Sequence, residues 1–273
     1  MKSLLIDADY TLYRTMAACE VEAELADEIW VRWADLGQVR EAFWETIEEM
    51  KKEWPADEFV EIVLCWTGPS AFRKRLDPAY KANRKGSVKP IGWKRIKAEL
   101  LEESNSWLHD EIEADDWLGI MPAYFTDYVV VSGDKDLDQI PGAHFWPWKE
   151  EKHWVVTPED ALRRFYEQVL SGDTVDNIPG CPGIGAVNAK RMVDKFNLHD
   201  ETDCWQRIVD KYGEQMRKKR DWRSPLDIAL TQARLVRILQ PGEYDTTNRT
   251  VNLWTPPTLK LSNVQSDPDL HLR

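Results

Sequence analysis

Apolar runs that end in acidic or turn residues recur along the chain. Residues 2–6, 61–66 and 129–131 are each a short, mainly apolar or β-branched run. Such runs predict strands that are buried on both faces, as in a parallel sheet. Because helical patterns separate the runs, the sequence predicts an α/β fold with a central, mostly parallel sheet and helices on both faces.

Apolar residues at helical spacing predict the helices. We expect a helix in two pieces over residues 20–54, broken near Gly37, and further helices over 93–108, 157–170, 205–212 and 226–239. Asp9 is the predicted cap of the first helix, and Thr157 with Pro158 predicts the start of another. Residues 142–156 predict a strand, a charged turn and a second strand at the sheet edge.

The chain is expected to form two parts. Residues 1–156 form the predicted α/β core, which includes an arch-like basic segment over residues 72–108. Residues 157–273 form the predicted helical region, with an irregular tail that becomes poorly ordered from about Ser262. The chain has 273 residues, enough for one large domain or two modest ones.

The cysteines and the N-terminal segment indicate a cytoplasmic protein. The apolar stretch at the N-terminus is cut short by Asp7, so we expect neither a signal peptide nor a membrane span there. The cysteines contain no CxxC pair and are far apart, which favours reduced thiols over a disulfide framework or a zinc site: Cys19, Cys65, Cys181 and Cys204.

The charge is distributed unevenly. The net charge is −12, yet between residues 72 and 97 Asp77 is the only acid among many basic residues. A local patch of this kind binds a phosphate backbone whatever the total charge, although a solvated helix face is the alternative. The basic residues of the segment are Arg73, Lys74, Arg75, Lys81, Arg84, Lys85, Lys89, Lys94, Arg95 and Lys97. A second basic cluster lies over residues 217–223.

Carboxylates follow two of the predicted strands. Asp7 ends the first run, and Asp134 and Asp136 follow the run at 129–131. Sites in open α/β sheets lie beyond the carboxyl ends of strands, where clustered acids need a cation such as a divalent metal. A solvated acidic turn is the alternative. Arg14, about two turns into the first helix, is expected near the same edge.

Two further acidic segments are candidates for the same site. Glu113 and Asp116 are three residues apart and share a face if a helix has begun there, and Asp115 joins them only near the helix start. Acids that interact favourably with the N-terminal dipole of a helix are the alternative. Asp173 and Asp176 have the same spacing in a turn or first helical turn.

A glycine pattern follows these last two acids. Gly183 and Gly185 precede a small residue, Lys190 and an apolar helix. Glycines before a helix allow backbone N–H groups to approach a phosphate closely at the helix N-terminus. The alternative is a helical hairpin that only packs.

Several of these segments together resemble the metal-dependent 5′ nucleases, which include bacteriophage 5′→3′ exonucleases, flap endonucleases and the 5′-nuclease domain of bacterial DNA polymerase I. The matching segments occur in the family order and span Ser3 to about Met192: LLIDAD, FRKRLDPAYKANR, EADD, SGDKDLDQ and GDTVDNIPGCPGIGAVNAKR. The length favours a phage exonuclease over a polymerase fragment.

The resemblance implies a 5′→3′ exonuclease or structure-specific 5′ nuclease that hydrolyses DNA at duplex 5′ ends and flaps in phage replication or recombination. RNA primers and RNA–DNA hybrids are further candidate substrates. The implied mechanism uses two Mg²⁺ ions, with Mn²⁺ as a substitute. The implied metal ligands are Asp7, Glu113, Asp115, Asp116, Asp134, Asp136, Asp173 and Asp176. No membrane partner is expected, and the implied location is the host cytoplasm.

The resemblance also implies roles for the basic residues. Lys81 and Arg84 match the family's catalytic pair, and Tyr80 beside them is implied to stack on or near the terminal nucleotide. The segment at about 173–196 matches a helix–hairpin–helix element that grips duplex backbone, in some members through a potassium ion. The residues expected to contact DNA are Arg14, Arg73, Tyr80, Lys85, Gly183, Gly185 and Lys190.

The chain departs from the family at one position. The family has an aspartate after the second strand, and Thr67 stands at that place here. The loss of a carboxylate implies either weaker metal binding or a water ligand. Three other interpretations are a ribonuclease of the same sheet type, a catalytically inert DNA-binding module and a phosphatase. The hairpin, the remaining acids and the basic segment, respectively, argue against them.

Overall fold

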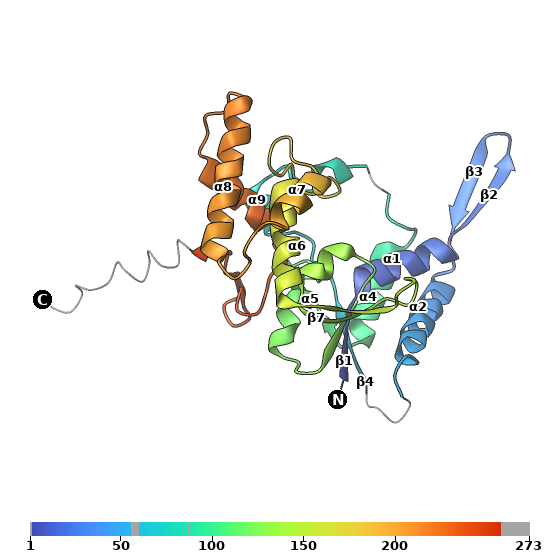
Figure 1. Ribbon diagram of the computed structural model, residues 1–273. Coiled ribbons are helices and arrows are strands. Elements are labelled where there is room, and N and C mark those ends of the chain that lie inside the picture. Colours follow the sequence, from blue (N-terminus) through green and yellow to red (C-terminus); the bar gives the residue numbers. More distant parts are fainter. Residues whose placement is uncertain (1, 56–59, 87, 258–273) are drawn as a thin grey trace, which may run out of the picture. The chain divides into compact units, whose positions relative to one another are not determined.

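The computed structural model describes residues 2–55, 60–86 and 88–257. The predicted disordered tail from Ser262 lies outside these residues. The chain divides into two compact units, one formed by residues 1–71, 86–156 and 239–241, the other by residues 72–85, 157–238 and 242–273. Figure 1 shows the elements of both units.

A six-stranded sheet forms the centre of the first unit, in the order β5-β4-β1-β6-β7-β8. Only β7 and β8 pair antiparallel, which confirms the predicted, mostly parallel sheet with a final strand pair at its edge. The carboxyl ends of β1, β4 and β6 lie side by side, because Asp7 pairs with Cys65 and Ile6 with Val131. The strands are β1 (Lys2–Asp7), β4 (Val60–Cys65), β5 (Ser106–Trp107), β6 (Tyr128–Val131), β7 (Gly142–Phe145) and β8 (His153–Val156).

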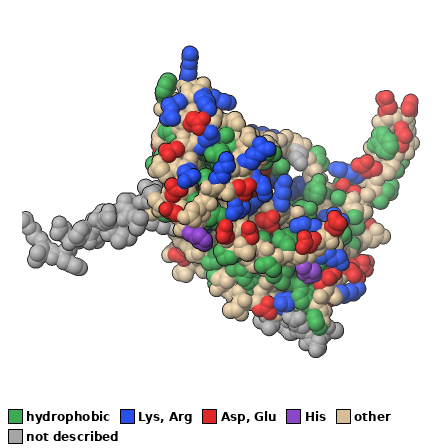
Figure 2. All heavy atoms as spheres, viewed as in Figure 1, with side chains coloured by type: hydrophobic (Ala, Val, Ile, Leu, Met, Phe, Trp, Pro, Cys, Tyr) green, Lys and Arg blue, Asp and Glu red, His purple; other side chains and the backbone are tan. Residues whose placement is uncertain are grey.

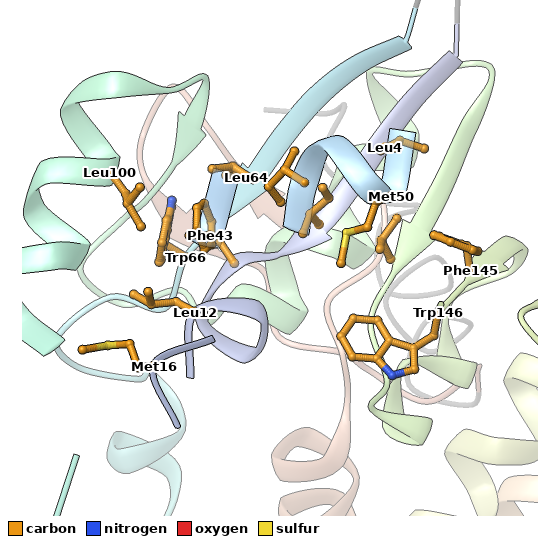
Figure 3. Packing of buried hydrophobic residues seen from close by; sticks show 14 of the residues in the cluster. Leu4, Leu12, Met16, Phe43, Met50, Leu64, Trp66, Leu100, Phe145 and Trp146 are labelled. Carbon is orange, nitrogen blue, oxygen red and sulfur yellow. The ribbon is translucent and has the colours of Figure 1, made fainter. Parts of the chain in front are cut away.

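Helices pack on both faces of this sheet. The buried side chains of α1 (Ala8–Cys19), α2 (Leu36–Lys51) and α4 (Trp93–Glu103) form one cluster with alternate strand residues (Figure 3). On the opposite face α5 (Ala114–Ile120) packs against β1 and β4. The predicted helix over 93–108 ends earlier than expected, at Glu103, because the chain extends into the edge strand β5.

The prediction of a helix over 20–35 is wrong. Residues in this segment form an antiparallel hairpin of β2 (Val21–Ala26) and β3 (Ile29–Trp33), which extends from the end of α1 in Figure 1. The β-branched Ile29 and Val31 and the two tryptophans of β3 favour a strand, and Glu28 has a positive φ of 61° at the turn. Acidic side chains lie at the free end of the hairpin (Figure 2). Helix α2 begins only after Asp35, which caps it.

The second unit is mainly helical. Thr157 caps α6 and Pro158 is its first residue, as predicted. Phe165 and Trp205 both pack edge-on against Trp254, with ring centroids 5.2 Å apart in each pair, and anchor the core of this unit. Its elements are α3 (Arg73–Leu76), η1 (Ala82–Arg84), α6 (Pro158–Ser171), α7 (Ala186–Val193), α8 (Glu201–Lys218), α9 (Pro225–Val236), β9 (Tyr244–Asp245) and β10 (Thr250–Val251).

The first part of the basic segment belongs to this helical unit. Residues 72–85 were expected with the α/β core, but Arg73 donates a 2.9 Å hydrogen bond to the Leu235 carbonyl and Asn177 donates a 2.7 Å hydrogen bond to the Ala79 carbonyl. These bonds tie residues 72–85 to α9 and to the loop before α7. Residues 86–108 lie with the sheet, so the expected arch is divided between the units.

Candidate active site

Asp7 and Asp134 meet at the carboxyl ends of two neighbouring strands. Asp7 ends β1, and Ser132 follows β6 directly beside it. The Ser132 hydroxyl donates a 3.1 Å hydrogen bond to Asp7 Oδ2 and accepts one of 3.1 Å from the Asp134 backbone N–H. The other carboxylate oxygen of Asp7 accepts the Tyr10 N–H, so Asp7, and not Asp9 as predicted, caps α1.

The surroundings of Asp7 are crowded with negative charge. Burial is the main cause that raises the pKa of Asp7 to about 7, and the nearby charges of Asp9 and Asp134 add to it. Burial also raises the pKa of the Cys65 thiol at the end of β4, with contributions from Asp7 and Asp115. The charges of three predicted ligands, Asp7, Asp115 and Asp134, are therefore felt at the same edge of the sheet, where they raise the pKa of a neighbouring group.

Stability without divalent cations is expected to depend on the protonation of Asp7. The folded state holds this proton more tightly than the unfolded chain, so the stabilising contribution is complete below pH 3.8 and is lost as the pH rises through about 7. The Asp7→Asn variant has no such proton to lose. We expect its melting temperature in EDTA, relative to the unchanged protein, to rise between about pH 5 and about pH 8.

The matched control for this measurement is Asp127→Asn. Asp127 lies in the same unit, but its side chain is half exposed and pairs with Lys2. Its substitution is expected to shift the melting temperature little at either pH. An Asp7→Asn difference that is the same at both pH values would contradict the assignment of the raised pKa.

Glu113 and Asp116 form the start of α5. Glu113 is the N-cap and Asp116 completes a capping box, because an Asp116 carboxylate oxygen accepts the Glu113 N–H at 3.3 Å. The other oxygen accepts the Leu239 N–H at 3.2 Å, and Asp116 is fully buried. These contacts match the alternative in which the acids satisfy a helix start. Asp115, at the next position after Ala114, is half-buried.

Asp134 and Asp136 begin the short helix η3 (Lys135–Gln139). Asp134 caps it by accepting the Asp136 N–H at 2.8 Å, and both side chains are half-buried. Asp138, further along η3, accepts a 3.0 Å hydrogen bond from the Trp154 indole. Asp138 therefore has a structural partner, whereas Asp134 lies close enough to Asp7 to affect its pKa.

A contact that the sequence did not predict joins Asp9 to Lys97. The Lys97 ammonium lies 2.8 Å from Asp9 Oδ1, and the other oxygen of Asp9 accepts the Thr67 N–H at 2.6 Å. Thr67, at the family's aspartate position, thus binds a carboxylate through its backbone. Asp9 had a signal in the sequence, two residues after Asp7. Nothing in the sequence indicates that Lys97 of the basic segment pairs with Asp9, because the two positions are 88 residues apart.

In the second unit the predicted catalytic pair is bound to Asp176. The Asp176 carboxylate accepts hydrogen bonds from the Arg84 guanidinium and, at 3.1 Å, from the Tyr80 hydroxyl. The Lys81 ammonium lies 3.4 Å from the same carboxylate. Lys81 has a left-handed φ of 55°, and its backbone N–H donates to the Asp176 carbonyl at 2.9 Å. The structure therefore brings together one predicted metal ligand and both predicted catalytic cations.

Asp173 begins the loop that carries Asp176. Its backbone forms a two-way bridge with Ile178, and its side chain accepts the Val175 N–H at 2.8 Å. The bridge packs Gly172 against Gly180 so closely that a Cβ on Gly172 would lie 2.2 Å from the Ile178 carbonyl oxygen. A glycine is thus needed at this turn. Membership of Asp173 and Asp176 in a metal site stays a prediction.

The predicted glycine hairpin ends at α7, with Gly185 as the N-cap. Gly183 has a left-handed φ of 78°, which a residue with a side chain rarely adopts. Gly185 has an extended backbone, and a Cβ built there would have no atom within 4 Å. The helix N-terminus is therefore open at Gly185. Lys190 of α7 is exposed.

Two of the expected DNA contacts are buried. Arg73 is only 4% exposed and donates to the carbonyls of Leu235 and Arg237, so its charge supports the fold and is not offered to DNA. Tyr80 is 3% exposed, so its ring has no free face for a nucleotide. The burial of these two side chains gives no support to their predicted contacts with DNA. Arg14 and Lys85 are exposed, and Arg14 lies over the Trp148 ring at 4.4 Å.

The described residues contain neither a ready-made metal cluster nor a membrane-spanning helix. Within residues 2–55, 60–86 and 88–257, no three His, Cys, Asp or Glu side chains are grouped closely enough to hold a metal ion. Over the same part of the chain, no helix has the length and apolar character needed to cross a membrane.

Comparisons with known proteins find one family and several relatives. Residues 2–166 match the family described as 5′-3′ exonuclease, N-terminal resolvase-like domain. The chain is 29% identical to the exodeoxyribonuclease of Enterobacteria phage T3, covering 93% of this chain and 92% of the phage protein. It is also 29% identical to the exonuclease of Escherichia phage T7, covering 93% of both.

Solved structures show a similar fold. A phage T5 5′-exonuclease with bound zinc superposes with a TM-score of 0.59 at 16% identity, covering 86% of this chain and 89% of the T5 chain. A bacteriophage T5 flap endonuclease in a pseudo-enzyme–product complex with DNA and metal ions gives a TM-score of 0.57 at 17% identity, with the same coverage.

Proposed function

Because the chain belongs to the 5′-3′ exonuclease family through its N-terminal resolvase-like domain, and is thus a hydrolytic nuclease, we propose that it hydrolyses DNA phosphodiesters at duplex 5′ ends and 5′ flaps. The observation that carries this proposal is the crowding of carboxylates around Asp7 at the carboxyl edge of the sheet. The phage relatives support a role in phage DNA replication or recombination in the host cytoplasm.

The acids of the first unit fit a divalent cation by their chemistry. They offer oxygen atoms only, which Mg²⁺ prefers, and the raised pKa of Asp7 indicates negative charge that a cation would compensate. The residues proposed to hold it are Asp7, Asp115 and Asp134, which would draw closer together around the cation, since no three acids of the described residues are grouped at metal-binding distance. The T5 structures that contain metal ions support metal dependence. Mg²⁺, with Mn²⁺ as a substitute, would supply an activated water and stabilise the leaving oxygen.

Lys81 and Arg84 are proposed to neutralise the scissile phosphate. In the structure both side chains form ion pairs with the Asp176 carboxylate, which also accepts a hydrogen bond from the Tyr80 hydroxyl. A phosphate dianion or diester offers the same kind of acceptor oxygens. We infer that the substrate phosphate takes the place of Asp176 as their partner and leaves this carboxylate available to bind a cation.

The duplex behind the cleaved end is proposed to lie at the N-terminus of α7. The open space at Gly185 and the positive end of the helix suit a backbone phosphate, and a potassium ion there would add to the charge. Contacts of this kind read the phosphate backbone, so little sequence preference is expected. The exposed Lys190, Lys85 and Arg14 are further proposed phosphate contacts.

Gly185→Val tests the proposed duplex contact. A side chain at this position meets no protein atom within 4 Å, so the fold has room for it, but it would fill the space proposed for the phosphate. We expect duplex affinity to fall about tenfold, which corresponds to the loss of about one charge-assisted contact. Fluorescence anisotropy with a labelled duplex in Ca²⁺ measures this change.

Gly185→Ser is the matched control. Serine is a good N-cap residue and is smaller than valine, so this variant should keep α7 and most of the affinity. Unchanged duplex affinity in the valine variant would show that the hairpin only packs within the second unit.

A substrate comparison tests the function itself. The full chain is incubated with Mg²⁺ and 5′-labelled forms of a blunt duplex, a nicked duplex, a 5′ flap, a matched RNA strand and an RNA–DNA hybrid. We expect nucleotide release from the 5′ ends of the DNA substrates and none in EDTA. Preferential cleavage of the RNA strand would favour the ribonuclease interpretation, and no cleavage of any substrate would favour a DNA-binding module.

A further inference from the structure

The ion pair between Asp9 and Lys97 lies at the same sheet edge as the acids. The Lys97 ammonium donates to Asp9 Oδ1 at 2.8 Å and to the Thr67 carbonyl at 2.7 Å. The two side chains are only 16% and 18% exposed. The Arg95–Glu99 pair on the same helix is 74% and 38% exposed. Salt and water screen the Asp9–Lys97 pair much less than such a surface pair.

Thr67 connects this ion pair to α5. Its backbone N–H donates to Asp9 at 2.6 Å, and its hydroxyl accepts the N–H of Ala114, the first residue of α5, at 3.0 Å. The Lys97 ammonium also lies 5.2 Å from the centre of the Trp66 ring, within the range of a cation–π contact. The lysine is therefore held from several sides. It is part of the edge, and not a mobile surface charge.

The charge of Asp9 belongs to the acidic group around Asp7, because it contributes to the raised pKa of Asp7. A cation of the chain itself, the Lys97 ammonium, neutralises the charge of Asp9. A divalent cation that approaches the edge meets the carboxylates of Asp7, Asp115 and Asp134, with Asp9 and its Lys97 partner beside them.

We propose that Lys97 is a resident cation of the acidic edge, which neutralises Asp9, positions Thr67 and thereby lowers the affinity of the edge for divalent cations. This inference rests on the proposed function only for the identity of the cation. Removal of the ammonium would leave one more negative charge near Asp7, in surroundings of reduced dielectric constant, and would strengthen the binding of a divalent ion.

Calorimetric titration of the full chain with MgCl₂ or CaCl₂, without DNA and at constant pH, tests the inference. Lys97→Met keeps the length of the side chain and removes its charge, so we expect cation binding about tenfold tighter. Lys97→Arg retains the charge and should bind as the unchanged protein does. Arg95→Met loses the same charge from the exposed pair on the same helix and should also leave the affinity unchanged.

The opposite substitution gives a change of opposite sign. Asp9→Asn leaves the Lys97 charge without its carboxylate, so cation affinity should fall. The double variant Asp9→Asn/Lys97→Met, which removes both charges, should return to about the unchanged value. Circular dichroism and the melting temperature in EDTA show whether each variant is folded, and Asp9→Asn tests the inference alone if Lys97→Met does not fold.

Either of two results would overturn the inference. In the first, the Lys97→Met variant binds Mg²⁺ and Ca²⁺ no more tightly than the unchanged protein does. In the second, the Asp9→Asn variant binds these ions as tightly as the unchanged protein or more tightly. Cleavage of labelled DNA is measured separately. Absence of cleavage would count against the proposed function, whereas the titrations without DNA decide the role of Lys97, so the two failures are distinguishable.

Discussion

Asp134→Asn is expected to lower the rate of 5′-end cleavage about 10²–10³-fold while the fold stays intact. Asp134 Oδ1 accepts the Asp136 N–H at 2.8 Å at the start of η3, and asparagine caps a helix as well as aspartate does. The substitution therefore removes a charge and keeps the cap. The rate of nucleotide release from a 5′-labelled duplex in saturating Mg²⁺ measures the effect.

Asp138→Asn is the matched control for this prediction. Asp138 lies in the same short helix and is also half-buried, but its carboxylate accepts the Trp154 indole N–H, and an amide oxygen accepts it equally well. This variant should retain full activity. Normal turnover of Asp134→Asn in Mg²⁺, or an equal loss in both variants, would contradict a specific role of Asp134 in holding the cation.

The central sheet was predictable because its signals are local. A strand buried on both faces needs a continuous apolar run, and β1, β4 and β6 each have one. The start of α6 was predictable for a similar reason, since Thr157 and Pro158 satisfy the cap and the first helical position within two residues. The positions of Asp7 and Asp134 then follow from the topology, because parallel strands end at the same edge.

The β2–β3 hairpin was not predictable from the same patterns. The apolar residues of α2, such as Phe43 and Ile47, recur at helical spacing, and the prediction extended this helix backwards to residue 20. In the hairpin the side chains are exposed or half-exposed on both faces, so the alternation of apolar and acidic residues from Val21 to Leu25 does not mark a buried face. The helical spacing of the apolar residues in α2 was the stronger pattern, and it led to the prediction of a helix in the hairpin segment as well.

Side chains that are paired over long distances in sequence were also missed. A basic residue within a basic segment carries no sign that it is buried. The hydrogen bonds to the carbonyls of Leu235 and Arg237 identify Arg73 as a structural residue. Two aspartates lie near the start of α1, and the sequence alone does not distinguish which of them is the cap. Asp7 takes the cap, and Asp9 turns to Thr67 and Lys97.

Lys81→Met is expected to lower kcat about 10²–10³-fold, with DNA affinity within about threefold of the unchanged protein. The ammonium lies 3.4 Å from Asp176 and 5.0 Å from the centre of the Tyr80 ring, and methionine retains an apolar stem beside that ring. The backbone hydrogen bond from Lys81 to the Asp176 carbonyl also remains. Since Arg84 still pairs with Asp176, the loop that carries this carboxylate should keep its position.

Lys74→Met separates this effect from a general loss of positive charge. Lys74 is exposed in α3 of the same basic segment and is not among the predicted catalytic residues, so its substitution should leave kcat unchanged. Steady-state kinetics on a 5′-flap substrate, together with anisotropy in Ca²⁺, distinguish the two parameters. A raised KM with unchanged kcat in Lys81→Met would mean that Lys81 only anchors the phosphate backbone, because an interaction made equally in ground state and transition state does not change kcat.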